Sequence, residues 1–220
     1  MELAQGYQAA IAGGVTSQTP RDALTEIATL RIELVDSDPL IWREVEVPTS
    51  ITLKGLHDIV QASMNWEDYH FWQFVVDGQT YGLPIEDDWE PPRKIASRVR
   101  LRDVLSSGVT EIEYTYDFGD GWDHRLIISK VRPGLPNIVY PRFIAGERNA
   151  PPEDCGGIYG FYDKLDTRAD PNDPDHADIT EWLGDYDPDK LEEMPIRYAL
   201  ARIAARQRAA ATRISKSKKT

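Results

Sequence analysis

The sequence predicts an α+β fold: a single domain whose antiparallel or mixed sheet is built from hairpins. Residues 28–35 and 41–47 alternate apolar and polar side chains, and turn-forming residues at 36–39 separate them. A helical period of apolar residues follows this hairpin at 53–64, and further helices are predicted mainly in the last third of the chain. Paired strands with helices set to one side are typical of the α+β class.

The segment after the first hairpin predicts one main helix. Thr52 suits its N-cap, Asn65 suits its end, and His57 falls on its polar face, where we expect it to be solvent-exposed. A second hairpin follows at 71–81, with Asp77-Gly78 as a two-residue turn. Residues 84–98 are rich in proline and acids and predict a long surface loop, and residues 99–105 predict a short helical turn.

A third hairpin is predicted from a strand at 111–116, a loop and a second strand led by residues 126–128. From Lys130 to about Gly157 we expect irregular structure, because prolines recur at 133, 136, 141, 151 and 152. Helices are predicted near 159–165, at 177–183, and from Ile196 to about Ala211 after Pro195.

The predicted organisation is a mobile N-terminal extension at 1–24, the domain at 25–195, and a C-terminal helix with a basic tail at 196–220. The net charge is −12, but residues 197–220 contain five Arg and three Lys without any acid, so residues 1–196 carry −20. This acidic body should repel nucleic acid, so contact with nucleic acid is expected only through Arg197–Thr220. The alternative is that this tail is a solvated basic extension.

No apolar run is long enough to cross a membrane, and no secretory signal precedes the domain. Cys155 is the one cysteine, so an internal disulfide is excluded. Both observations favour a cytoplasmic protein.

Two polar stretches predict the functional site. The first, Tyr116–His124, holds three Asp, one His, two Gly and three aromatic residues; the second runs from Ala145 to Gly157. We expect a ligand site where loop 117–124 faces loop 146–157. The candidate ligand-binding residues are Tyr116, Asp117, Asp120, Trp122, His124, Glu147, Arg148, Glu153, Asp154 and Cys155.

A divalent metal is one interpretation of this site. Asp117, Asp120 and His124 offer carboxylate and imidazole ligands, and Glu153 or Asp154 could complete the shell or act as a base. The alternative is a structural role, in which Asp and Gly are ordinary turn residues and the aromatic side chains belong to the core. A thiol enzyme using Cys155 with His124 is a third, weaker interpretation.

Several segments, in this order, resemble one known family. They are Ile41-Trp42-Arg43, Val47-Pro48, Leu53 through Trp66, His70, Asp77-Gly78, Tyr116 through Asp120 with Trp122 and His124, Tyr140-Pro141-Arg142, Gly146-Glu147-Arg148, Pro151 through Gly157, and Trp182-Leu183. Together they resemble the Ri-plasmid open-reading-frame family, the plasmid pRiA4b ORF-like proteins, which include passenger proteins of insertion elements. The resemblance covers about residues 26–195.

The resemblance implies a single α+β domain close to a β-grasp fold, and it implies no established activity. Family members often have cysteines where this chain has Phe143 and Ala150, so a thiolate-rich structural zinc site is not expected here. We therefore expect a non-catalytic binding or accessory module of mobile-element origin, with an unidentified protein or small ligand as partner. The alternative is a metal-dependent hydrolase or nuclease that uses Asp117, Asp120, His124 and Glu153.

Overall fold

The computed structural model describes residues 25–84 and 93–217, with side chains up to residue 210. The predicted extension at 1–24 lies outside the described residues. The strands are β1 (Glu26–Leu34), β2 (Trp42–Pro48), β3 (Trp72–Val76), β4 (Gln79–Gly82), β5 (Lys94–Ile95), β6 (Glu111–Tyr116), β7 (Trp122–Pro133) and β8 (Arg142–Glu147). The α-helices are α1 (Leu53–Met64), α2 (Leu101–Leu105), α3 (Gly157–Ala169), α4 (His176–Leu183) and α5 (Glu193–Ser217), and a 3₁₀ turn, η1, spans Ala96–Arg98.

The eight strands form one sheet in the order β5-β4-β3-β6-β7-β1-β2-β8. All neighbours are antiparallel except β4 and β5, which are parallel, so the sheet is mixed. The three predicted hairpins are present as β1–β2, β3–β4 and β6–β7. The predicted α+β class is thereby confirmed, whereas the expected likeness to a β-grasp fold stays a prediction.

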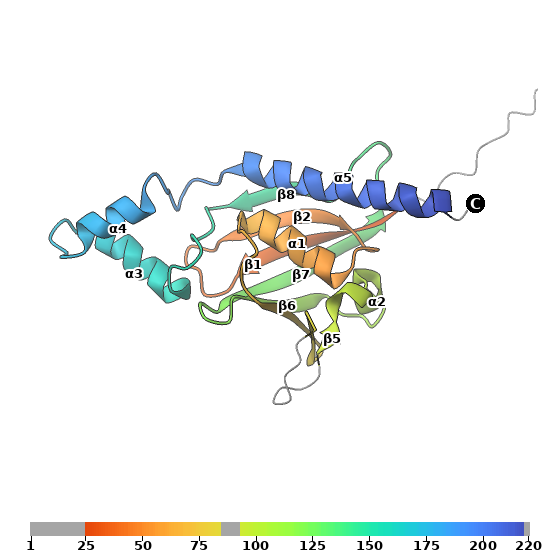
Figure 1. The fold of residues 1–220 in the computed structure, drawn as a ribbon, viewed down its shortest axis with the longest axis horizontal. Coiled ribbons are helices and arrows are strands. Elements are labelled where there is room, and N and C mark those ends of the chain that lie inside the picture. Colours follow the sequence, from red (N-terminus) through yellow and green to blue (C-terminus); the bar gives the residue numbers. More distant parts are fainter. Residues whose placement is uncertain (1–24, 85–92, 218–220) are drawn as a thin grey trace, which may run out of the picture.

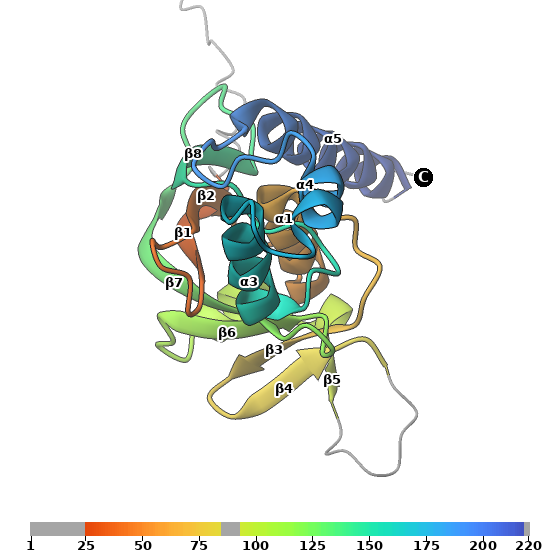
Figure 2. The same cartoon turned by 90° about the vertical axis from the view of Figure 1, so that its left-hand side faces the viewer.

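Helices α1 and α5 cover one face of the sheet, and α3 and α4 lie together beyond one end of the strands (Figures 1 and 2). The core forms between α1 and the inner row of strand side chains, including Leu30, Val45, Phe74 and Leu126, all with no exposed surface. Burial of this apolar surface is the main force that holds α1 on the sheet.

Helix α1 begins and ends where the sequence predicts. The Thr52 side chain accepts a hydrogen bond from the Gly55 N–H (3.1 Å), and Asn65 closes the helix in a left-handed conformation (φ 59°). The expectation that His57 is solvent-exposed is wrong. Its ring is fully buried, stacks on Trp72 at 4.1 Å, and bonds both Tyr114 Oη (2.8 Å) and Asp68 Oδ1 (2.7 Å).

The expectation of irregular structure from Lys130 to Gly157 is also wrong. Strand β7 continues to Pro133, and β8 pairs with β2 as the edge of the sheet. Pro141 directly precedes β8, a position that an edge strand tolerates because no ladder hydrogen bond is lost. In the predicted loop 84–98, residues 85–92 lie outside the described part, and residues 94–98 form β5 and η1.

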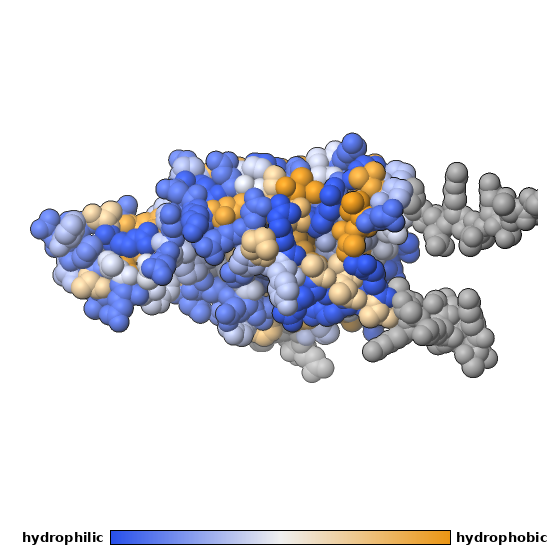
Figure 3. Space-filling model, turned by 90° about the horizontal axis from the view of Figure 1, so that it is seen from above, coloured by the Kyte–Doolittle hydropathy of each residue, from blue (hydrophilic) through white to orange (hydrophobic). Residues whose placement is uncertain are grey.

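Helix α5 belongs to the same core as the sheet, because Ile196, Leu200, Ile203 and Ala204 are buried against α1 and β8. The predicted boundary between 195 and 196 therefore falls inside a packed helix. Over α5 the surface is mainly hydrophilic, with separate apolar patches (Figure 3). Among the described residues, no helix has the length and apolar character to span a bilayer.

Candidate functional site

The turn between β6 and β7 is built around Asp117. Its backbone is left-handed (φ 53°), its N–H donates to the Phe71 carbonyl (2.9 Å), and its carbonyl accepts from the Gly121 N–H (2.6 Å). Its Oδ1 accepts from the Gly119 N–H (2.9 Å). One carboxylate oxygen is thus used to hold the turn, as the structural interpretation expects, and Oδ2 takes no part in that hydrogen bond.

Trp122 and His124 do not belong to this turn, because β7 already begins at Trp122. Alternation along the strand directs both side chains into the core, where each is at most 2% exposed. Burial lowers the pKa of His124 to about 4, so the ring is neutral near pH 7. The expected ligand set of Asp117, Asp120 and His124 is therefore not brought together, and none of the groups of metal-ligand atoms found among the described residues contains His124.

The second polar stretch does meet the first. Asp120 Oδ2 accepts a hydrogen bond from the Gly156 N–H (3.1 Å). Glu153 accepts from Tyr116 Oη at 2.5 Å and from the Glu67 N–H at 2.7 Å. The expected proximity of the two loops is present, but both Glu153 oxygens already serve as acceptors in the contact.

The remaining predicted site residues make structural contacts. Glu147 accepts from the Trp42 indole N–H at 3.3 Å, and Arg148 pairs with Asp189 at 2.5 Å. Cys155 is 1% exposed, and burial raises the pKa of its thiol to about 12, so thiolate is scarce at neutral pH.

A cleft of about 330 Å³ lies beside these contacts, between the segment that follows α1 and the segment 149–154. We call it the acidic cleft; among its lining residues are the rings of Trp66, Tyr69 and Tyr186 and the carboxylates of Glu67, Glu153 and Asp154. The Trp66 indole donates to the Pro151 carbonyl (2.8 Å), and the Tyr69 side chain is exposed. Aromatic faces next to carboxylates form a surface that attracts cations.

Sequence reasoning missed His70 as a site residue. It precedes β3, and the register that pairs Trp72 with Tyr116 places it beside the β6–β7 turn. His70 Nε2 lies 3.6 Å from Asp117 Oδ2 and 3.2 Å from Asp154 Oδ1. The signal that could have found it is the pairing of β3 with β6, which the order of strands along the chain does not specify.

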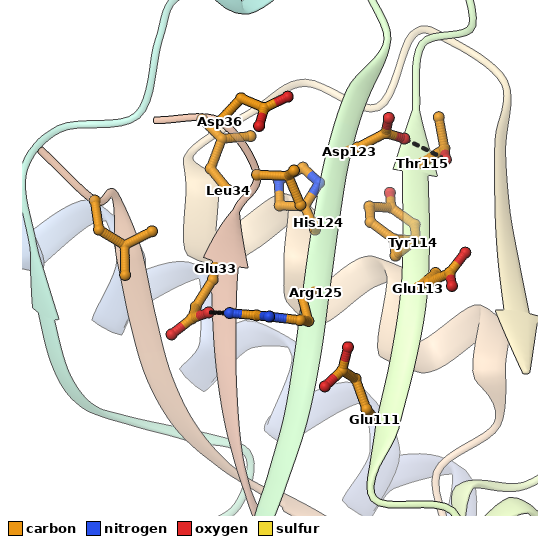
Figure 4. A pocket seen from close by; sticks show the side chains of 12 residues that line it. Glu33, Leu34, Asp36, Glu111, Glu113, Tyr114, Thr115, Asp123, His124 and Arg125 are labelled. Atoms are coloured by element: carbon orange, nitrogen blue, oxygen red, sulfur yellow. Dashed lines mark hydrogen bonds and ion pairs between the residues drawn. The ribbon is translucent and has the colours of Figure 1, made fainter. Parts of the chain in front are cut away.

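A second hollow, of about 470 Å³, lies on the face of the sheet opposite α1 (Figure 4). Arg125 there pairs with Glu33 at 2.7 Å, and Asp123 accepts from Thr115 Oγ1 at 2.6 Å. Glu111 and Glu113 also line it. This face therefore adds negative charge to the body, which opposes binding of polyanions.

The model of the family described as plasmid pRiA4b ORF-3-like protein matches residues 26–194. "Uncharacterized protein y4hQ" from Sinorhizobium fredii is 34% identical over 167 residues, which are 74% of this chain and 85% of that protein. A crystal structure titled as a protein of unknown function, MM3350 from Methanosarcina mazei Go1, superposes with a TM-score of 0.70 at 33% identity and covers 77% of this chain and 96% of that one. The match to the family model spans the sheet and helices α1 to α4. This chain therefore belongs to the plasmid pRiA4b ORF-3-like protein family.

Proposed function

We propose that this protein is a non-catalytic accessory module of mobile-element origin that binds a cationic segment of a protein partner in the acidic cleft. The plasmid named in the family description supports the origin. The observation that carries the binding role is that Asp120, Glu153, His124 and Cys155 are already engaged or buried, while the cleft next to them stays open. Asp120 and Glu153 accept structural hydrogen bonds.

The pKa shifts support the same conclusion. A general base should have a pKa near the working pH, but burial holds that of His124 at about 4 and that of the Cys155 thiol at about 12. A hydrolase or nuclease using Asp117, Asp120, His124 and Glu153 has less support, because His124 faces the core and each Glu153 oxygen already accepts a structural hydrogen bond.

The charge of the cleft favours a basic ligand. Glu67 and Asp154 are exposed acids at its edge, and the ring of Tyr69 stands beside them. A lysine or arginine side chain could contact the aromatic face and a carboxylate together. The net charge of −20 on residues 1–196 would attract such a segment over a longer range. Nucleic-acid contact through Arg197–Thr220 stays a separate prediction.

The test uses fluorescence anisotropy with two labelled ten-residue peptides, one rich in Lys and Arg and one rich in Asp and Glu, in a buffer with EDTA. We expect binding of the basic peptide only, and at least tenfold weaker binding by Tyr69→Ala and Glu67→Gln. Glu113→Gln, which removes an acid from the opposite face, is the matched control and should change the affinity by less than about twofold, because Glu113 can act on the peptide only through the long-range charge of the body. Equal losses in all three variants, or no binding of the basic peptide, would refute the proposal.

A further inference from the structure

We propose that His70, Asp117 and Asp154 form a binding site for one divalent transition-metal ion, such as Zn²⁺ or Mn²⁺. One ligand atom from each residue lies within 4.8 Å of the other two. The three come from different segments: the approach to β3, the β6–β7 turn and the loop before α3. An ion there would connect all three segments at the edge of the acidic cleft.

The spacing of the ligand atoms fits a coordination shell. Zinc binds imidazole nitrogen and carboxylate oxygen at about 2.0–2.2 Å, so two ligands of a tetrahedral site lie roughly 3.4 Å apart. The distances from His70 Nε2 are 3.6 Å to Asp117 Oδ2 and 3.2 Å to Asp154 Oδ1. These two values bracket the spacing, and the two carboxylate oxygens lie within 4.8 Å of each other, so the carboxylates would move together by up to about 1.4 Å for an ion to bind all three ligands.

Several shielded side-chain atoms of the described residues lack a hydrogen bond, His124 Nε2 in the core among them, but His70 Nε2 is the one that belongs to this group of metal-ligand atoms. His70 Nε2 is shielded from solvent and has no hydrogen bond of acceptable geometry to any described residue, although two carboxylates stand beside it. Buried polar atoms almost always have a partner. A metal ion between the nitrogen and the two carboxylates would provide one.

The surroundings of Asp117 and His70 fix the orientation of these two side chains. The Gly119 N–H holds Asp117 Oδ1, which leaves Oδ2 for the ion. The ring of His70 lies edge-on to Tyr116 at 5.7 Å, and Tyr116 Oη in turn accepts from the Tyr69 N–H at 3.0 Å. Such outer contacts orient ligands and strengthen metal binding.

The donor set indicates the class of ion. One imidazole with two carboxylates suits Zn²⁺ or Mn²⁺ better than Ca²⁺, which prefers oxygen ligands alone. Three protein ligands leave at least one position open, and the Asp154 side chain is 69% exposed, so that position would face solvent. The bound ion could then accept an anionic or carbonyl oxygen of a ligand at the surface.

A second group of this kind among the described residues, formed by His57, Asp58 and Asp68, differs in a useful way. Both ring nitrogens of His57 already have partners, and Asp58 pairs with Lys54 at 2.7 Å. No ring nitrogen is left for an ion. Asp58→Asn therefore removes one carboxylate from a comparable group without touching the proposed site, and it serves as the matched control.

The test is isothermal titration of the chelator-treated full chain with Zn²⁺ and with Mn²⁺, together with thermal denaturation. We expect one ion per chain, a higher Tm with metal, and at least tenfold weaker binding by His70→Ala and Asp154→Asn, with Asp58→Asn within twofold of the parent. Because Asp154 is exposed, its variant should fold even if His70→Ala does not. The absence of stoichiometric binding, or equal affinity in Asp154→Asn and the parent, would overturn the inference.

This site shares Asp154 with the acidic cleft, so a bound ion and a basic segment would compete for that carboxylate, but the two proposals are tested separately. The peptide assay contains EDTA and the metal titration contains no peptide, so each proposal can fail while the other holds. If His70 were only an ion-pair partner of the two acids, its removal would change the Tm but no metal would bind.

Discussion

Gly157 offers the sharpest test of how the two polar loops are joined. It opens α3 with a left-handed backbone (φ 70°), and a Cβ added there would lie 2.2 Å from the Asp120 carbonyl oxygen. That distance is far below any normal contact between these atoms. The Asp120 backbone cannot withdraw easily, because its side chain also holds the Gly156 N–H.

We expect two costs from Gly157→Ala. A left-handed backbone costs a residue with a Cβ about 1–2 kcal/mol, and forced overlap in a packed region costs about 1–3 kcal/mol more. The summed loss of about 2–5 kcal/mol should lower the Tm by roughly 4–20 °C, at about 2–4 °C per kcal/mol for a chain of this size.

Gly78 provides the control, because it has a similar φ of 75° but nothing within 4 Å of its added Cβ. Gly78→Ala should therefore lower the free energy of unfolding only by the backbone contribution of about 1–2 kcal/mol. The difference between the Tm changes of the two variants measures the effect of the steric overlap at Gly157. Hydrogen exchange should show a less protected Gly156 amide only in Gly157→Ala. If Gly157→Ala lowers the Tm no more than Gly78→Ala, the loops are not in the close contact described here.

Two further predictions concern buried groups. The pKa of His124 is lowered from 6.5 to about 4, so the unfolded chain binds a proton first as the pH falls, and stability should decrease between pH 6.5 and 4 by about 3 kcal/mol. Urea denaturation across this range should show a flatter pH dependence in His124→Phe; an unchanged slope would mean that another group is responsible. The buried Cys155 thiol, with its pKa raised to about 12, should react with a disulfide reagent at pH 8 only after denaturant is added. Rapid reaction of the native protein would show that the thiol is accessible.

Local patterns predicted the elements whose determinants lie within a few residues. The cap at Thr52, the left-handed end at Asn65 and the turn at Asp77-Gly78 are all where the sequence places them. Each depends on the conformational preference of the residue itself and on hydrogen bonds to residues a few positions away in the chain. The same reasoning could not give the order of the sheet, because pairing of β3 with β6 and of β1 with β7 joins segments far apart in sequence.

The wrong expectations arose where a local rule met a tertiary contact. His57 lies on the polar face of its helix by composition, yet Trp72 and Tyr114 from the sheet cover it. Proline at 141 predicted irregular structure, but an edge strand begins directly after it. In both cases the deciding partner is a strand whose position the sequence pattern does not reveal.

The same limit explains the candidate site. Tyr116–His124 contains enough carboxylates and imidazole for a metal site, but the start of β7 at Trp122 turns His124 toward the core and separates it from Asp117. The sheet then supplies a different imidazole, that of His70, because β3 lies beside β6. The composition of a polar stretch therefore suggests the chemistry of a site, whereas strand register determines which residues carry it. Titration of His70→Ala beside His124→Phe would separate the two ligand sets directly: only loss of metal binding in the His70 variant agrees with the register.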